Sequence, residues 1–206
     1  AKCSKGYVSL IVLETGGSSN LCRHLSIGEK VILMGPTGRG TEISKNENVI
    51  LIGGGLGNAV LFSIGEQLKK NNCKVLYFAG YKKLDDLYKR EEIENSSDQV
   101  FWSCENGLIQ SRRDQDFTIR GNIIDGLNYY KNKLAQNWPN CLFRFQDVNR
   151  IIVIGSPGLM KVVTKWRYHG DGKSILSKNC RLIGSINSPM QCMMKEICAQ
   201  CLQRKV

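Results

Sequence analysis

The stretch from residue 49 to residue 59, Val-Ile-Leu-Ile-Gly-Gly-Gly-Leu-Gly-Asn-Ala, constrains the fold of this chain more than any other. Its apolar run predicts a buried strand, and the glycines predict a tight turn that leads into a helix. Glycine lets the backbone approach a diphosphate closely, and a helix start offers free N–H groups to its negative charge. A glycine turn also occurs where a strand and a helix merely pack closely, but the strand–helix–strand setting favours dinucleotide binding.

From residue 49 to residue 187 the chain repeats one pattern: a short apolar strand, a glycine turn and an amphipathic helix. This alternation is typical of an α/β fold, and it predicts a five-stranded parallel, Rossmann-like sheet with helices on both faces. We expect strands at 49–53, 74–79, 99–104, 150–155 and 181–186, and helices near 57–70, 85–94, 119–134 and 157–168. The polar segment 106–118 lacks periodicity, so it predicts a surface loop.

The first 45 residues have a different pattern. Residues 7–14 are rich in β-branched and aromatic side chains and predict a strand. Ser18 and Ser19 are candidate N-caps of a short helix that continues to Leu25. Residues 30–34 predict another strand, closed by a tight Gly-Pro-Thr-Gly loop at 35–38. We therefore expect three parts: a partial β domain (1–45), a nucleotide-binding domain (46–188) and a cysteine-containing tail (189–206).

Composition excludes several classes of protein. The longest apolar runs are much shorter than the roughly 20 residues of a membrane span, so we expect no membrane insertion. Nine cysteines without an export signal indicate reduced thiols and a cytoplasmic location. The first residue is Ala1, which suggests an excised fragment. There is no Gly-x-Ser-x-Gly elbow or phosphate-loop lysine, and His24 and His169 offer no catalytic dyad.

The formal net charge of +11 narrows the choice of partners. Lysine and arginine occur in short runs beside acidic residues and form no basic stripe interleaved with aromatic side chains. We therefore expect no nucleic-acid binding. A phosphorylated cofactor or an acidic electron-transfer partner accounts for the same charge.

Four motifs occur in an order that identifies a family: Gly17-Ser18-Ser19-Asn20, Gly35-Pro36-Thr37-Gly38, Gly53-Gly54-Gly55-Leu56-Gly57 and Gly155-Ser156-Pro157-Gly158-Leu159-Met160. In this order the chain resembles the ferredoxin–NADP reductase superfamily over nearly its whole length. It is most similar to subunits that feed electrons into glutamate synthase-like or dihydroorotate dehydrogenase-like enzymes. The resemblance implies that the first 45 residues are the remnant of a β-barrel flavin-binding domain.

The resemblance also assigns the NAD(P)H contacts. The pyrophosphate would be bound by Gly53, Gly54, Gly55, Gly57 and Asn58. The turn with Gly80, Tyr81 and Lys82 would meet the ribose and adenine, and Gly155, Ser156, Pro157, Gly158 and Met160 would form the wall beside the nicotinamide. Lys82 or Lys83 would pair with a 2′-phosphate, or would be a solvated charge, so NADH versus NADPH stays open. Glu105 follows the third strand and would touch the cofactor or remain exposed.

The flavin half has fewer matching residues. Gly17, Ser18, Ser19 and Asn20 resemble the helix that holds the FAD diphosphate, whereas the family's Arg-x-Tyr-Ser flavin strand would precede residue 1. Because cofactor contacts divided between two segments lose most of their affinity when one is absent, we expect weak or no FAD retention by this chain.

In the tail, Cys192, Cys198 and Cys201 lie close enough in sequence to converge on one metal. The related subunits place a 2Fe–2S cluster here, but with a four-residue first gap and a fourth cysteine. An iron–sulfur cluster, a zinc site and metal-free thiols all remain open, and Cys180, solvent or another chain would supply a fourth ligand.

Two hypotheses follow. In the first, the chain is an enzyme module that binds NAD(P)H, passes its hydride to FAD, and sends electrons towards an iron–sulfur centre in concert with an upstream flavin segment and other oxidoreductase domains or subunits. In the second, it is a degenerate, non-catalytic domain that binds nucleotide or braces a larger oxidoreductase. Val60, where the family usually has proline, and the altered cysteine spacing favour the second.

Overall fold

The computed structural model describes residues 2–4, 6–12, 14, 16–33 and 40–186. The chain divides into two compact units, one containing Ala1–Glu42 and the other Ile43–Asn187. In the described ranges, no helix has both the length and the apolar character needed to cross a lipid bilayer.

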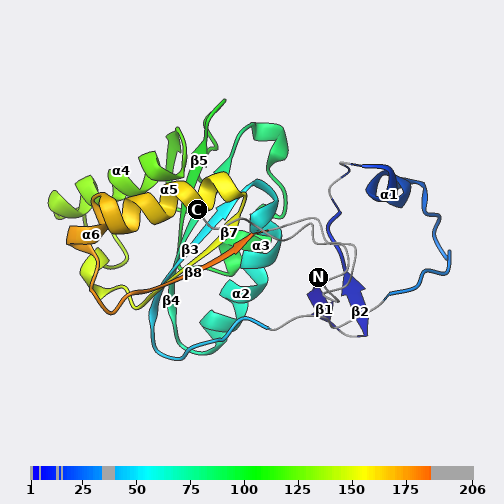
Figure 1. Cartoon of the computed structure of the whole chain (residues 1–206), viewed down its shortest axis with the longest axis horizontal. Helices are drawn as coiled ribbons and strands as arrows, with labels where there is room; N and C mark the ends of the chain where they lie inside the picture. Colours follow the sequence, from blue (N-terminus) through cyan, green and yellow to red (C-terminus); the bar gives the residue numbers. More distant parts are fainter. Residues whose placement is uncertain (1, 5, 13, 15, 34–39, 187–206) are drawn as a thin grey trace, which may run out of the picture. The chain divides into compact units, whose positions relative to one another are not determined.

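A parallel sheet of six strands forms the centre of the larger unit, in the order β6-β5-β4-β3-β7-β8 (Figure 1). The strands are β3 (Asn48–Gly54), β4 (Lys74–Tyr81), β5 (Gln99–Cys104), β6 (Phe117–Arg120), β7 (Arg150–Gly155) and β8 (Arg181–Ile186). The register places Gly54 beside Gly80 of β4 and Gly53 beside Ile154 of β7. The central strands β3, β4, β5 and β7 are almost entirely buried, which explains their continuous apolar sequences.

Helices cover both faces of this sheet (Figure 1). Val49 and Leu51 of β3 pack in one core cluster with residues of α2 (Asn58–Lys70) and α3 (Arg90–Asn95). Ile50 and Ile52 point to the other face, which is covered by α4 (Ile123–Ala135), α5 (Pro157–His169) and α6 (Gly172–Ile175). Successive residues of a strand point to opposite faces, so a single apolar run supplies both cores.

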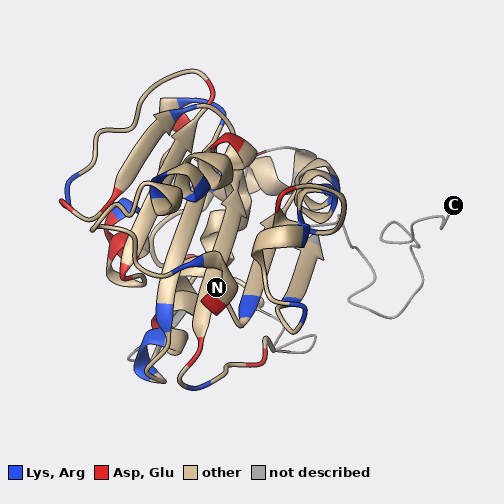
Figure 2. Ribbon diagram, turned by 90° about the vertical axis from the view of Figure 1, so that its left-hand side faces the viewer, with Lys and Arg blue, Asp and Glu red and all other residues tan. Residues whose placement is uncertain are grey.

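Among the described residues, Lys and Arg lie interspersed with Asp and Glu along the ribbon (Figure 2). The free thiols of Cys73, Cys104 and Cys180 are buried, that of Cys141 is half-buried and that of Cys22 is exposed. Burial raises the pKa of the Cys180 thiol.

The five expected strands are confirmed, and the structure adds a sixth. β6 occupies Phe117–Arg120, at the junction of the segment expected to be a loop (106–118) and the helix expected at 119–134. Helix α4 therefore begins only at Ile123, where the side chain of Asn122 accepts hydrogen bonds from the N–H groups of Ile124 (2.8 Å) and Asp125 (3.2 Å). The interpretation of 119–122 as helix was wrong because this cap starts the helix later.

Helix α3 is also shorter than expected. Residues 84–86 form a separate 3-10 turn, and the helix starts at Arg90 rather than near residue 85. Lys89, which precedes it, has a left-handed backbone (φ 50°), a conformation that cannot continue an α-helix.

The smaller unit contains an antiparallel pair, β1 (Lys2–Ser4) and β2 (Tyr7–Ser9), followed by α1 (Gly17–Asn20) and a 3-10 turn (Leu21–His24). Of the described residues in the expected strand 7–14, only Tyr7–Ser9 form a strand, and residues 30–33 belong to none. Ile32 is 93% exposed and belongs to no strand. A β-branched sequence is therefore not sufficient to form a strand where no neighbouring strand among the described residues pairs with it. The predicted loop at 35–38 lies outside the described residues.

Candidate nucleotide-binding site

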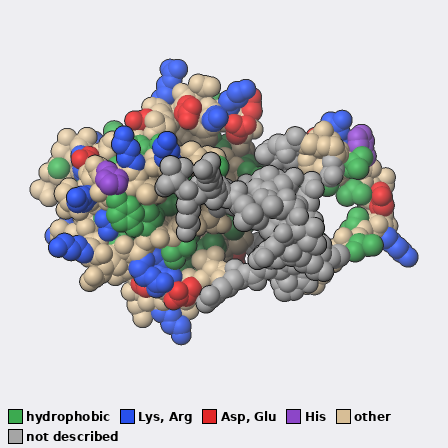
Figure 3. Space-filling view, in the orientation of Figure 1, with side chains coloured by type: hydrophobic (Ala, Val, Ile, Leu, Met, Phe, Trp, Pro, Cys, Tyr) green, Lys and Arg blue, Asp and Glu red, His purple; other side chains and the backbone are tan. Residues whose placement is uncertain are grey.

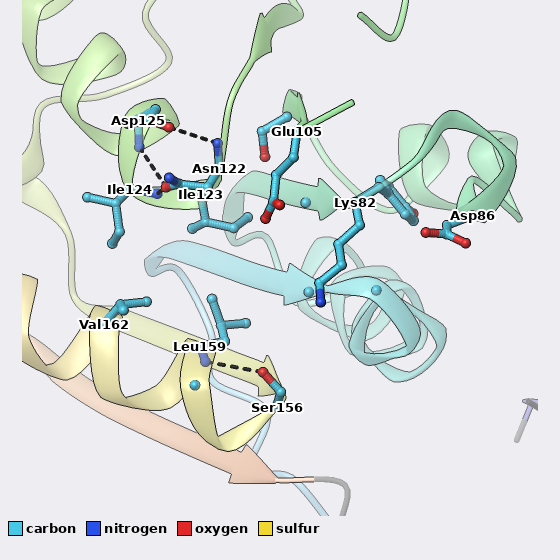
Figure 4. A pocket seen from close by; sticks show the side chains of 16 residues that line it. Lys82, Asp86, Glu105, Asn122, Ile123, Ile124, Asp125, Ser156, Leu159 and Val162 are labelled. Carbon is cyan, nitrogen blue, oxygen red and sulfur yellow. Dashed lines mark hydrogen bonds between the residues drawn. The ribbon is translucent and has the colours of Figure 1, made fainter. Parts of the chain in front are cut away.

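A pocket of about 680 Å³ opens at the carboxyl end of the parallel sheet (Figure 4). Strands β3 and β7 are parallel neighbours whose following helices lead to β4 on one side and to β8 on the other, so the order of the strands reverses between them. Ligands of open α/β sheets bind at such switch points. The pocket is lined by Gly54, Gly55, Gly80, Tyr81, Lys82, Asp86, Ser103, Glu105, Asn122, Ile123, Ile124, Asp125, Ser156, Gly158, Leu159 and Val162.

The glycine turn between β3 and α2 is shaped by close backbone contacts. A Cβ at Gly57 would lie 2.0 Å from the carbonyl oxygen of Ile154, so only glycine lets α2 start this close to β7. Gly55 has a positive φ of 52°, where a side chain is strained, and a Cβ there would meet nothing within 4 Å. The turn is therefore closed on the β7 side and open at Gly55, which lines the pocket.

Asn58 holds this turn from inside the protein. Its side chain is fully buried, and its Nδ2 donates to the carbonyl oxygen of Gly55 (3.0 Å) while its Oδ1 accepts from the hydroxyl of Tyr77 (3.2 Å). The hydroxyl of Tyr88 donates to the same Gly55 carbonyl (3.1 Å). Burial raises the pKa of Tyr77 well above its usual value and that of Tyr88 to about 12, so both phenols stay protonated donors at neutral pH. Asn58 thus positions the turn and does not line the pocket.

Three helices begin at the pocket, and their first turns differ. At α4, Asn122 caps the free N–H groups and Asp125 adds a negative charge. At α5, the Ser156 hydroxyl accepts from the N–H of Leu159 (3.2 Å). Helix α2 has neither a side-chain cap nor an acidic residue in its first turn. It continues the 3-10 turn Gly55–Gly57, and the N–H of Asn58 donates to the carbonyl oxygens of Gly55 and Leu56. The positive end of the helix dipole and the lack of an acidic side chain make this the start that best accommodates an anion.

Four charged residues line the pocket: Lys82, Asp86, Glu105 and Asp125. The two aspartates accept backbone N–H bonds at the starts of helical turns. The side chains of Lys82 and Glu105 extend into the pocket, and neither has a hydrogen-bond or ion-pair partner among the described residues (Figure 4). They are the two charged side chains of the pocket wall available to a ligand.

Sequence relatives share this region. The chain is 30% identical over 200 residues to an uncharacterized protein of Rickettsia prowazekii, a match that covers 97% of this chain and 19% of that protein. It is 30% identical over 103 residues to the electron transfer subunit of dihydroorotate dehydrogenase B (NAD(+)) of Clostridium perfringens (48% of this chain, 41% of that subunit). The same subunit of Streptococcus pneumoniae serotype 4 is 23% identical over 189 residues, covering 90% of this chain and 66% of the subunit. No family profile matches the chain.

Two solved structures have the same arrangement of elements. The NADH-dependent reduced ferredoxin-NADP oxidoreductase matches 92% of this chain and 58% of its own chain, with a TM-score of 0.66 and 20% identity. The ferredoxin-NADP+ reductase of Plasmodium falciparum matches 82% of this chain and 65% of its own, with a TM-score of 0.52 and 17% identity. The chain has the ferredoxin–NADP reductase fold. It is homologous to the electron transfer subunits of dihydroorotate dehydrogenase B, and it spans less than two thirds of the length of these relatives.

Within this reductase fold, the residues expected beside the nicotinamide separate into two groups. Ser156 and Gly158 line the pocket, whereas Gly155 does not, because the place of its missing side chain is filled by Leu159 (2.7 Å). Pro157 is the first residue of α5 and lies outside the pocket lining. Met160 faces a smaller groove between α5 and β8, where its Sδ lies 3.0 Å from the Cβ position of Gly184. On the face of the molecule that Figure 3 shows, hydrophobic side chains are exposed among Lys and Arg.

Of the residues expected at the diphosphate and ribose, Gly54, Gly55, Gly80, Tyr81 and Lys82 line the pocket, whereas Gly53, Gly57 and Asn58 shape it from behind. Sequence reasoning missed the contributions of α4 and α5: Asn122, Ile123, Ile124, Asp125, Leu159 and Val162. The sequence carried a signal for the residues at the start of α4, because an asparagine followed by an apolar pair and an aspartate is typical of a helix start.

The sequence also predicted a flavin site and a metal site. Gly17–Asn20 form the four-residue helix α1 of the smaller unit, where the Ser19 hydroxyl bonds the backbone of Gly16. Cys192, Cys198 and Cys201 lie outside the described residues, and Cys180 is buried in the core beneath α5. Within the described ranges, no three His, Cys, Asp or Glu side chains are grouped so as to hold a metal ion.

Proposed function

We propose that this chain is the NAD(P)H-binding electron-transfer module of a flavin-dependent oxidoreductase. The observation that carries the proposal is the glycine turn at Gly54 and Gly55, which lines the pocket at the switch point of a parallel sheet and leads into a helix with no acidic residue in its first turn. The names of the relatives support it, since they include electron transfer subunits and an NADH-dependent ferredoxin-NADP oxidoreductase.

The pocket suggests how the dinucleotide is held. The diphosphate is bound by N–H groups at Gly54 and Gly55 and by the dipole of α2, and the free amine of Lys82 adds a positive charge. The nicotinamide lies against Ser156 and Gly158 at the start of α5. Hydride transfer needs alignment rather than an acid or base, so these residues act by orienting the ring. Bound FAD would supply a hydride acceptor that can release electrons singly.

Beyond the flavin, we predict that electrons move towards an iron–sulfur centre at Cys192, Cys198 and Cys201. We also predict that other domains or subunits complete the oxidoreductase. Glutamate synthase-like and dihydroorotate dehydrogenase-like enzymes are both candidate partners. None of these steps is needed for the pocket itself to bind a reduced nicotinamide dinucleotide.

Binding is tested directly by titrating the chain with NADH and NADPH and following the fluorescence of the reduced nicotinamide. Lys82→Gln removes the one cation of the pocket wall, so we expect it to weaken binding about fivefold, the upper range for an exposed ion pair. Lys83→Gln is the matched control, because Lys83 is exposed but does not line the pocket. We expect this control to bind like the parent chain.

The outcomes separate the two hypotheses. If neither dinucleotide binds at millimolar concentration, nucleotide binding is wrong for this pocket. If NAD(P)H binds and the flavin-loaded protein of natural length reduces a dye in its presence, the enzyme module is supported. Binding without dye reduction by that flavin-loaded protein would support the alternative, a non-catalytic nucleotide-binding domain.

A further inference from the structure

We propose that Asn106 is a self-modification site, where the side-chain amide is lost by intramolecular deamidation and the carboxylate that replaces it weakens ligand binding in the pocket. The modification itself is independent of the proposed function, whereas its effect on affinity rests on that function. Two features carry the inference: the unbonded state of the reacting groups in the turn after β5, and the position of this turn at the pocket.

Asn106 is the only asparagine of the chain that is followed by a glycine, Gly107. In deamidation the backbone nitrogen of the following residue attacks the side-chain carbonyl carbon of the asparagine. A side chain on the following residue hinders this attack. Glycine has none, so its nitrogen is accessible and its backbone turns freely. This pair is therefore the position of the chain where the sequence most favours the reaction.

The reaction needs water as its only co-reactant. A bond forms between the nitrogen of Gly107 and Cγ of Asn106, the bond from Cγ to Nδ2 breaks, and ammonia leaves with the proton of the attacking nitrogen. Water then opens the cyclic imide at one of its two carbonyl groups and gives an aspartate or an isoaspartate. No group is oxidised or reduced. The net change replaces a neutral amide by a negative charge, which acts on its surroundings like any charge-changing modification.

The folded chain leaves both reacting groups unbonded. Asn106 is exposed, and neither its side-chain amide nor the N–H of Gly107 forms a hydrogen bond with any described residue. The attack therefore breaks no existing hydrogen bond. The turn is anchored on both sides of the pair, because the N–H of Asn106 donates to the carbonyl oxygen of Lys82 (3.0 Å) and the side chain of Ile109 is buried. The reaction can thus proceed without unfolding of β5.

Asn95 is a matched contrast within the same chain. It is also exposed and is also followed by a small residue, Ser96, at the end of α3. The N–H of Ser96, however, donates to the carbonyl oxygens of Glu92 (3.1 Å) and Ile93 (3.2 Å), and Ser96 is buried. Because this nitrogen is already bonded and held in place, we expect Asn95 to keep its amide in the folded chain.

The new charge at Asn106 would lie at the edge of the pocket. Asn106 directly follows Glu105, whose side chain extends into the pocket (Figure 4). The lining contains one lysine and three carboxylates, which is already a formal charge of −2. One more carboxylate beside this wall opposes the approach of a negatively charged diphosphate. An aged chain should therefore bind NAD(P)H more weakly than a freshly made one.

Peptide mass spectrometry tests the reaction after incubation in warm, mildly alkaline buffer, in the folded chain and in the chain unfolded by urea. We expect Asn106 to deamidate at comparable rates in both states, with isoaspartate among its products, and Asn95 to deamidate only in urea. Gly107→Ala should slow the reaction. The new methyl group would lie 2.6 Å from Cγ of Leu84, an exposed side chain that can move aside.

Three results would overturn the site. Asn106 could keep its amide in the folded chain while losing it in urea, it could react no faster than Asn95 in the folded chain, or the reaction could be as fast in Gly107→Ala. Each would show that the unbonded glycine nitrogen does not control the chemistry.

NADH titration tests the effect on the pocket. We expect Asn106→Asp and the aged parent to bind NADH about two- to fivefold more weakly than the fresh parent, the range for one exposed charge. Asn95→Asp adds the same charge on α3, outside the pocket lining, and should bind like the parent. Equal affinities of Asn106→Asp and the fresh parent would overturn the effect on binding. A parent that binds neither NADH nor NADPH would instead contradict the proposed function, on which the mass measurements do not depend.

Discussion

The hydroxyl of Tyr77 lies 3.2 Å from the side-chain oxygen of Asn58, and both side chains are fully buried. This bond links the middle of β4 to the first residue of α2. Because Asn58 also donates to the carbonyl of Gly55, the shape of the glycine turn depends on a tyrosine that never reaches the pocket. The turn is thus held by buried polar contacts as well as by its glycines.

Replacing Asn58 by leucine tests this support. Asn58→Leu leaves the Tyr77 hydroxyl without this acceptor and removes a donor to Gly55, so we expect a loss of about 1–3 kcal/mol in the free energy of unfolding. NADH affinity should fall with it. Tyr77→Phe keeps the bond from Asn58 to Gly55 and should cost less on both counts. Urea unfolding and NADH titration measure the two effects; an Asn58→Leu chain as stable as the parent would contradict the prediction.

The contact between α2 and β7 gives a second prediction. A Cβ at Gly57 would lie 2.0 Å from the Ile154 carbonyl, and backbone cannot move aside cheaply, so Gly57→Ala should destabilise the chain by about 3 kcal/mol. In Gly158→Ala the new Cβ meets nothing nearer than 3.6 Å, and this helical position should lose no stability. Thermal unfolding of both variants measures these changes in stability. Equal melting temperatures would show that the α2 start can shift away from β7.

The central sheet was predictable because its signals are local. In β3, β4, β5 and β7 an apolar run, rich in β-branched and aromatic residues, stops at a turn, and each run is buried on both faces. The glycine turn was predictable for the same reason. Tyr77 could not be singled out, because within such a buried run nothing distinguishes the tyrosine that bonds Asn58 from one that only packs.

Strand β6 escaped prediction because long-range contacts create it. Its four residues are only half-buried or exposed, and the preceding segment is polar. The Asp116 side chain accepts from the N–H of Val100 on β5 (2.8 Å), and Arg113 donates to both oxygens of that carboxylate and to the carbonyl of Glu94. Since α4 follows β6 directly, missing this strand also concealed the side of the pocket formed by Asn122 to Asp125.

The Arg113–Asp116 pair should therefore stabilise β6. The Asp116 side chain is fully buried, so Asp116→Ala leaves Arg113 without its carboxylate partner and should cost about 3 kcal/mol, as expected for breaking a buried pair. Asp147→Ala is the control, because its pair with Arg144 is exposed and should contribute at most about 1 kcal/mol. Urea unfolding gives the free energies, and hydrogen exchange should show faster opening at Phe117–Arg120 in the first variant alone. Unchanged exchange there would argue against this role for Asp116.

Three tyrosines close to the glycine turn, Tyr77, Tyr81 and Tyr88, predict how stability depends on alkaline pH. Burial raises the pKa of Tyr88 from 10.0 to about 12 and raises the pKa values of Tyr77 and Tyr81 well above that ordinary value. In the unfolded chain these phenols ionise at their ordinary pKa, so between pH 10 and 12 the folded chain binds more protons than the unfolded chain. The free energy of unfolding should therefore be unaffected by these groups below pH 10 and should fall as pH rises above it.

Tyr88→Phe removes one of the three shifted phenols, so the fall in stability above pH 10 should be shallower than in the parent. Urea unfolding at a series of pH values measures the slope, and near-ultraviolet absorbance of the folded chain follows tyrosinate formation. If all seven tyrosines ionise together near pH 10 in the folded chain, the cluster is open to water and does not pack behind the turn. The same substitution removes the hydroxyl donor to Gly55, so NADH affinity at pH 7 should fall even though no phenol is ionised there.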